Sequence, residues 1–94
     1  MFLVLLKYNC PLSKVDPHIP AHRTFLDKHY QSNSFLCSGP MNPREGGVIL
    51  AKAESRAALE KILSEDPFWQ NKIADYQIIE FNPVKASPEF QKCL

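Results

Sequence analysis

The stretch MFLVLLKY, residues 1–8, decides the fold of this chain. Phe2 to Leu6 are apolar without interruption, and a short apolar run free of turn residues is typical of a strand buried on both faces. A chain of 94 residues has room for one sheet and about two helices, and these can cover only one face of that sheet. The other face needs a cover as well. We therefore expect a homodimer in which two copies of the chain pack sheet to sheet.

Composition indicates one globular domain over residues 1–94, with a C-terminal tail from about residue 83 that has little periodic pattern. The hydrophobic content of 45% and charged content of 22% are ordinary for such a domain. The net charge of +1 offers no electrostatic reason to expect binding to nucleic acid or to a membrane surface. No run approaches the roughly 20 apolar residues of a membrane span.

The N-terminus and the cysteines indicate the cellular compartment of the protein. No basic segment precedes the first apolar run, and no small-residue cleavage site follows it, so we expect no signal peptide. Cys10, Cys37 and Cys93 are an odd number without CxxC spacing, which is typical of free thiols in a reducing environment. We expect a cytoplasmic protein.

A first helix is predicted from about Asp16 to Gln31, with Asp16 as N-cap and a proline at the first helical position. Pro20 is early enough to be tolerated, because first-turn amides have no partner within the helix. At about 100° per residue the apolar side chains and all three histidines fall on one arc, whereas Arg23 points away from it.

Three further strands and one helix are predicted after it. A strand over residues 34–41 ends at Gly39-Pro40, and the proline favours an edge position. The loop 42–47, NPREGG, leads to a strand over residues 48–54, apolar on both faces. Ser55 is a natural N-cap for a helix over residues 56–65, which Pro67 ends. The last strand is predicted over residues 76–81.

The predicted order is strand, helix, strand, strand, helix, strand. With right-handed crossovers this gives an α+β, ferredoxin-like βαββαβ sandwich with an antiparallel sheet, in which the first and third strands are central. Those are the two strands that are apolar on both faces, so the pattern and the topology agree.

Three motifs also carry a resemblance that covers the chain to about residue 81. They are AHRTFL in the first helix, with His22, SGP at the end of the second strand, and DPF after the second helix, with Asp66. In this order they resemble the YciI-like (YCII-related) family of small dimeric α/β barrel proteins. The resemblance implies a dimer with a cleft between helices and sheet that contains a histidine–aspartate pair. It also implies lyase-like or isomerase-like relatives that act on small ring compounds.

His22 and Asp66 each have two interpretations from the residues alone. His22 is an inward-facing imidazole that can act as a general acid or base, or can be a core histidine that only needs a hydrogen-bond partner. Asp66 can orient that imidazole, or can cap a short helical turn beginning at Pro67, and one carboxylate oxygen can serve each purpose.

The remaining candidates are weighed in the same way. Substrate-binding candidates are Tyr8, the segment Ser38, Gly39 and Pro40, and Arg44, although Tyr8 and Cys10 also fit simple packing and Arg44 can be only solvated. His18 and His22 lie four residues apart, a spacing that also arises by chance, so we expect no metal site. Phe68 and Trp69 are expected in the core or an interface. No nucleotide or cluster motif is present, and we expect no cofactor.

The leading hypothesis is a small cofactor-independent lyase or isomerase that moves a proton on a small cyclic or carboxylated substrate. In it, His22 is the general base or acid and Asp66 its orienter. Two alternatives remain open. One is a non-catalytic ligand-binding or interaction domain, and the other is a cofactor-free monooxygenase of the kind found on related barrels.

Overall fold

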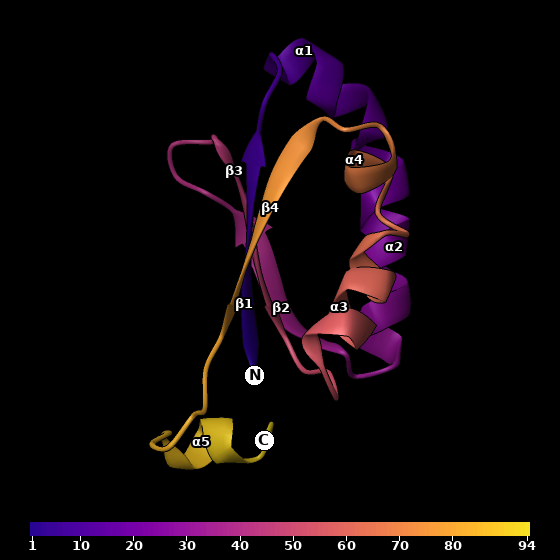
Figure 1. Cartoon of the computed structure of the whole chain (residues 1–94). Helices are drawn as coiled ribbons and strands as arrows, with labels where there is room; N and C mark the ends of the chain where they lie inside the picture. Colours follow the sequence, from indigo (N-terminus) through magenta and orange to yellow (C-terminus); the bar gives the residue numbers. More distant parts are fainter.

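A four-stranded antiparallel sheet with helices against one face is the framework of the computed structural model, which describes all of residues 1–94 (Figure 1). The strand order is β2–β3–β1–β4, so the first and third strands are central, as the sequence predicts. The bounds are β1 (Phe2–Tyr8), β2 (Phe35–Pro40), β3 (Gly46–Ala51) and β4 (Ala74–Glu80). The ferredoxin-like fold is confirmed, and β2 is an edge strand, as Pro40 indicates.

The helical layer is formed by α2 (Ile19–Gln31), α3 (Arg56–Leu63) and the short α4 (Pro67–Gln70), which lie on the same side of the sheet (Figure 1). Ser55 caps α3 as predicted, because its side chain accepts a hydrogen bond from the Ala58 amide at 3.1 Å. The helix ends at Leu63, two residues before the predicted end.

The segment before α2 differs from the prediction. In place of one helix from Asp16, the chain forms α1 (Leu12–Val15) and the 3-10 turn η1 (Asp16–His18), and α2 begins only at Ile19. Pro20 lies in the first turn of α2, where a missing amide hydrogen costs nothing. Asp16 is not an N-cap, because its carboxylate pairs with Arg44 instead.

The β3 strand also starts earlier than predicted, at Gly46, and ends at Ala51 rather than at residue 54. Gly46 pairs with Lys7 of β1, and a Cβ placed on it would lie 1.8 Å from the Leu6 carbonyl oxygen. The strand therefore continues into the glycines of the loop because only a residue without a side chain allows this close approach. The last strand likewise begins two residues early, at Ala74.

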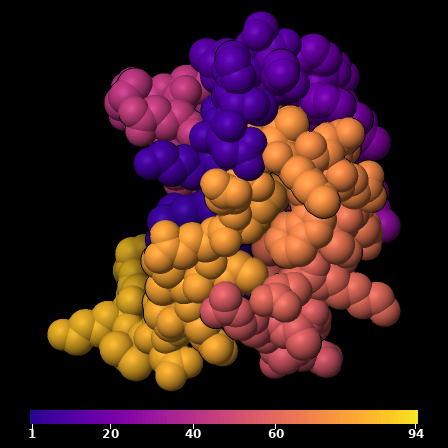
Figure 2. Space-filling view, turned by 45° about the horizontal axis from the view of Figure 1, so that its top comes forward, coloured from indigo at the N-terminus to yellow at the C-terminus, as the bar shows by residue number.

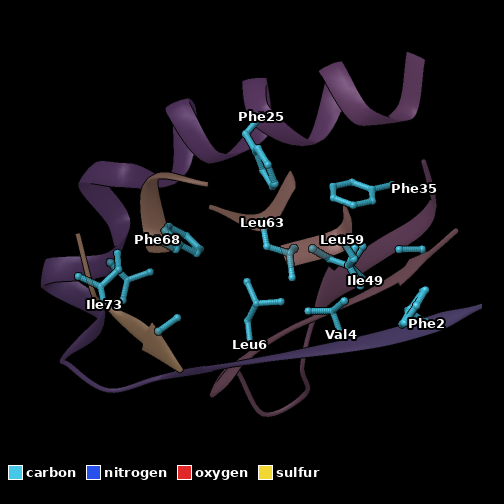
Figure 3. Packing of buried hydrophobic residues seen from close by; sticks show 13 residues of the cluster. Phe2, Val4, Leu6, Phe25, Phe35, Ile49, Leu59, Leu63, Phe68 and Ile73 are labelled. Atoms are coloured by element: carbon cyan, nitrogen blue, oxygen red, sulfur yellow. The ribbon is translucent and has the colours of Figure 1, made fainter. Parts of the chain in front are cut away.

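The core lies between the sheet and the helices (Figure 3). On β1 the side chains of Phe2, Val4 and Leu6 alternate into it, and Phe25 of α2 points toward Leu63 of α3 from the other layer. Burial of this apolar surface is the main stabilising term, at roughly 25 cal/mol for each Å² removed from water. The helices and the sheet are thus joined through one continuous cluster.

The other face of the sheet is apolar and carries no helix. Leu3 and Leu5 of β1 alternate away from the core, and Leu3 lies opposite Leu50 of β3 and Ile79 of β4. Directly opposed residues on antiparallel strands point to the same face, so these side chains form one patch. Ile79 is 39% exposed, a large value for isoleucine in a strand.

The C-terminal tail contains one short helix, α5 (Pro88–Gln91), where the sequence predicts little periodic structure. Ser87 caps it by accepting the Phe90 amide at 3.2 Å. The tail lies at the end of the sheet near the N-terminus, away from α2 (Figures 1 and 2). Lys52 holds it there by donating to the Cys93 carbonyl oxygen at 2.7 Å.

Candidate active site

A pocket of about 300 Å³ lies between α2 and the strands β1, β2 and β3. One wall consists of Ile19, His22 and Leu26 from successive turns of α2. These residues lie on one side of the helix because residues three and four apart are neighbours on its surface. Phe68 of α4 also lines the pocket.

His22 and Asp66 are in contact, although 44 residues separate them in the chain. The Nδ1 atom of His22 lies 2.8 Å from Oδ1 of Asp66. The His22 side chain is 15% exposed and lines the pocket, whereas Asp66 is fully buried behind it. Since Nδ1 is taken by Asp66, Nε2 is the ring nitrogen left for a molecule in the pocket.

Asp66 is placed by the turn that it begins. It is the N-cap of α4, with Pro67 at the first helical position, and its Oδ1 accepts from the Phe68 amide at 3.0 Å. The expectation that one oxygen caps the turn while the other contacts the imidazole is wrong, because Oδ1 does both. Oδ2 instead accepts from the hydroxyl of Tyr76 at 2.5 Å. The buried carboxyl group therefore accepts from two donors and contacts His22 as well, so none of its oxygens is left without a partner.

The imidazole is also held by its face. The rings of His22 and Phe68 are stacked, with centroids 4.0 Å apart and planes 7° apart. Phe68 is 2% exposed, which agrees with its predicted place in the core. Trp69 is 36% exposed in the single chain, so it is not part of the core, and its ring packs against Tyr76.

The residues predicted to bind substrate lie around the same pocket: Tyr8, Ser38, Gly39, Pro40 and Arg44. The Tyr8 ring packs edge-on against Phe68, with centroids 5.9 Å apart. Ser38 shares a hydrogen bond with the hydroxyl of Tyr30 from α2. The strand β2 thus brings its polar end to the pocket while its first residue, Phe35, enters the core.

Arg44 lies at the rim and is already paired. Its Nη2 donates to Oδ1 of Asp16 at 2.6 Å, and its guanidinium lies 5.9 Å from the centre of the Tyr8 ring. The hydrogen bond to Asp16 raises the pKa of Arg44 further above its ordinary value. Arg44 therefore stays cationic, and its position is set by an exposed carboxylate.

Arg23 and Tyr76 were missed by sequence reasoning. The helical periodicity predicts that Arg23 points away from the apolar arc, but Arg23 is exposed and lines the pocket. Its spacing of four residues from Ile19 is the signal that could have placed it there. Tyr76 had no such signal, because its bond to Asp66 depends on how β4 meets α4. With Arg44, Arg23 gives the pocket two guanidinium groups and no acidic side chain in its lining.

The other histidines lie elsewhere. His18 precedes α2 and does not line the pocket. His29 is buried, and its Nε2 lies 3.1 Å from Oε1 of Glu65, which Lys28 also binds at 2.8 Å. Cys10 does not line the pocket, and its thiol contacts the Ile73 carbonyl oxygen at 3.7 Å.

No three or more histidine, cysteine, aspartate or glutamate side chains are grouped so that they could hold a metal ion. None of the helices has both the length and the apolar character to cross a membrane.

Comparison with solved structures identifies a protein of similar fold. It is 5-chloro-2-hydroxyhydroquinone dehydrochlorinase from Burkholderia phenoliruptrix AC1100, solved in complex with 2,5-dihydroxybenzoquinone. The TM-score is 0.72 at 16% sequence identity, and the match covers 87% of this chain and 94% of the dehydrochlorinase chain. At this identity the similarity shows the fold. No curated protein matches the sequence.

The sequence itself matches the family model of the YCII-related domain over residues 1–82. This range contains the whole sheet, the helices that cover it and the candidate site, and leaves out the tail with α5. The protein belongs to the YCII-related family.

Proposed function

We propose that the protein is a small enzyme that moves a proton on a small cyclic or carboxylated anion, in a lyase-like or isomerase-like reaction. One observation carries the proposal: His22 has one ring nitrogen held by a buried carboxylate and the other left to a pocket. This is the arrangement of a general base with an orienting acidic partner. A histidine that served only packing would not need to line a cavity.

In the proposed reaction, Nε2 of His22 takes a proton from a carbon or oxygen of the substrate. Asp66 accepts a hydrogen bond from the Nδ1–H group throughout, and its negative charge stabilises the imidazolium that forms. The imidazolium then returns the proton to another substrate atom, which gives an isomer, or to a leaving group, which completes an elimination. The proton moves only between substrate and His22, so the reaction requires no cofactor.

The pocket supports an anionic ring as substrate. Arg23 and Arg44 are the charged groups of its lining, so a carboxylate or phenolate is attracted and a cation is repelled. Phe68 and Tyr8 provide aromatic surface beside His22. The solved dehydrochlorinase binds a hydroxylated quinone on the same fold, which also supports a planar ring.

We further propose that residues 1–94 form a single domain that assembles as a homodimer through the patch of Leu3, Leu5, Leu50 and Ile79. Such pairing would complete an α/β barrel of two sheets, one from each chain. The three cysteines are free thiols, which supports the cytoplasm as the compartment.

The test begins with a thermal-shift screen of small cyclic acids, lactones and phenols, including 2,5-dihydroxybenzoquinone, followed by proton exchange on each hit. His22→Asn keeps an N–H that can donate to Asp66, so we expect the fold to survive while the exchange rate falls by roughly 10² to 10⁴. The matched control is His18→Asn, a histidine outside the pocket, which should exchange at the wild-type rate.

A hit that exchanges equally fast in wild type and His22→Asn would contradict the proposal and favour a ligand-binding module. A loss of stability of about 1 to 3 kcal/mol without loss of exchange would identify His22 as a structural residue.

A further inference from the structure

We propose that Tyr76 is a positioning residue of this site: through Asp66 it holds His22 in the tautomer with the proton on Nδ1 and the lone pair of Nε2 facing the pocket. The inference rests on the proposed function, in which Nε2 is the base. It concerns a residue that does not line the pocket.

Tyr76 reaches Asp66 from the sheet. It lies opposite Leu6 of β1, whose side chain is buried toward the helices, so Tyr76 points to the same side. Its hydroxyl donates to Oδ2 of Asp66 at 2.5 Å. The Trp69 ring packs against the Tyr76 ring, with centroids 4.9 Å apart at 61°, and this contact restricts the orientation of the phenol.

The hydroxyl of Tyr76 remains protonated under ordinary conditions. Burial raises the pKa of Tyr76 far above its usual value, and the neighbouring Asp66 carboxylate raises it further. Tyr76 therefore acts as a donor to Asp66, and Oδ2 acts as an acceptor.

The other oxygen of Asp66 also accepts a hydrogen bond from a group that can only donate. Oδ1 accepts the backbone amide of Phe68, a group that cannot accept in return. Both oxygens of Asp66 are therefore engaged as acceptors, and an Nδ1–H group of His22 is the partner that fits this arrangement. The proton between Oδ1 and His22 then resides on Nδ1, and Nε2 keeps its lone pair.

Loss of the Tyr76 hydroxyl removes one of the two donors that keep Asp66 in the role of acceptor. Oδ2 would be a buried oxygen without a partner, a state that is relieved when the carboxyl group rotates or takes up a proton. A protonated Asp66 can donate to Nδ1, and the imidazole then carries its own proton on Nε2 and can no longer act as a base toward the pocket.

The test is the ¹⁵N spectrum of the imidazoles in the full chain, recorded at a pH where free imidazole is neutral. The His22 signals are assigned with His22→Asn. In wild type we expect Nδ1 to resonate as a protonated nitrogen and Nε2 as an unprotonated one. In Tyr76→Phe the two resonances should move toward each other, since both tautomers become populated.

The matched control is Tyr30→Phe, which also removes a tyrosine hydroxyl near the pocket, but one bonded to Ser38 rather than to Asp66. It should leave the His22 resonances at their wild-type positions. His29, whose partner is Glu65, should not change in either variant and provides an internal reference.

A double variant separates Tyr76 acting through Asp66 from a general loosening of the fold. In an Asp66→Asn background the carboxylate is already absent, so adding Tyr76→Phe should produce no further change in the tautomer ratio. If Tyr76→Phe changed the tautomer ratio equally in the wild-type and Asp66→Asn backgrounds, the inference would be overturned.

Unchanged His22 resonances in Tyr76→Phe would also overturn it, even if His22→Asn abolishes proton exchange and the proposed function stands. Conversely, a shifted tautomer ratio together with full exchange activity in His22→Asn would leave Tyr76 as the positioning residue and reject the proposed function. The two proposals can therefore fail separately.

Discussion

His22 lies flat on Phe68, with the ring centroids 4.0 Å apart, while the edge of the same imidazole contacts Asp66. Asp66 and Phe68 belong to one turn, as the N-cap and second residue of α4. The four-residue helix α4 thus restricts the imidazole of His22 twice. Phe68 stacks on the face of the ring, and Asp66 contacts its edge. The candidate site depends on this turn as much as on α2.

We expect Phe68→Leu to lower the free energy of unfolding by about 1 to 3 kcal/mol, because it removes a buried ring and its stacking on His22. Urea denaturation measures the change. Trp69→Leu, the adjacent and more exposed aromatic residue, should cost less. Equal losses would show that the stacked pair contributes nothing beyond general burial.

Gly46→Ala should destabilise the sheet, because the new methyl group would lie 1.8 Å from the Leu6 carbonyl oxygen and the strands must move apart. We expect a loss of about 1 to 3 kcal/mol in the free energy of unfolding. Gly39→Ala is the control, since no atom lies within 4 Å of its added carbon. The prediction fails if the two alanine variants unfold at the same denaturant concentration.

The cluster of Lys28, His29 and Glu65 predicts a loss of stability in acid. Lys28, and to a smaller extent His29, hold the pKa of Glu65 below its usual value. A depressed folded-state pKa contributes stability above the unfolded value of about 4.3, and this contribution is lost as pH falls through the folded value. Melting temperatures measured below pH 5 should fall less steeply in Glu65→Gln than in wild type. Glu54→Gln, an exposed glutamate outside any ion pair, should follow wild type.

Arg44 and Asp16 predict opposite effects on the binding of anions. Arg44→Gln should weaken binding of an anionic hit from the thermal-shift screen about tenfold, since a bond to a charged group is lost. Asp16→Asn releases the guanidinium from its partner and should tighten binding by about two- to fivefold, the range expected for an exposed pair. Titration calorimetry measures both. Arg56→Gln on α3 is the control, and an equal effect there would mean that only net charge matters.

The apolar outer face predicts a homodimer. Leu5→Lys should give a monomer in light scattering at micromolar concentration, because it places a charge in the patch. Leu12→Lys, which makes the same change at a leucine exposed on α1, should leave the mass at that of wild type. The melting temperature of wild type should rise with protein concentration, and that of Leu5→Lys should not. A monomeric wild type would contradict the assembly.

The sequence by itself determined the architecture. The apolar run of β1, the cap at Ser55 and the proline that ends β2 are local signals, and local signals suffice to predict four strands in this order with two helical crossovers. The resemblance to the YciI-like (YCII-related) family, together with the inward projection of both residues, nominated His22 and Asp66. The errors in the fold were at element ends, where the reason lies in a distant strand, as at Gly46, or in a distant ion pair, as at Asp16.

Only the tertiary structure decided how the site is assembled. Hydrophobic periodicity shows which side of a helix is buried, but not which residues pack against that side. No local sequence pattern therefore shows that Oδ1 of Asp66 contacts both His22 and the Phe68 amide. The same holds for Tyr76, whose hydroxyl meets Asp66 only because β4 pairs with β1 beneath α4. Hydrogen bonds depend on distances of a few tenths of an ångström and on direction, and these are properties of the packed layers rather than of any one segment.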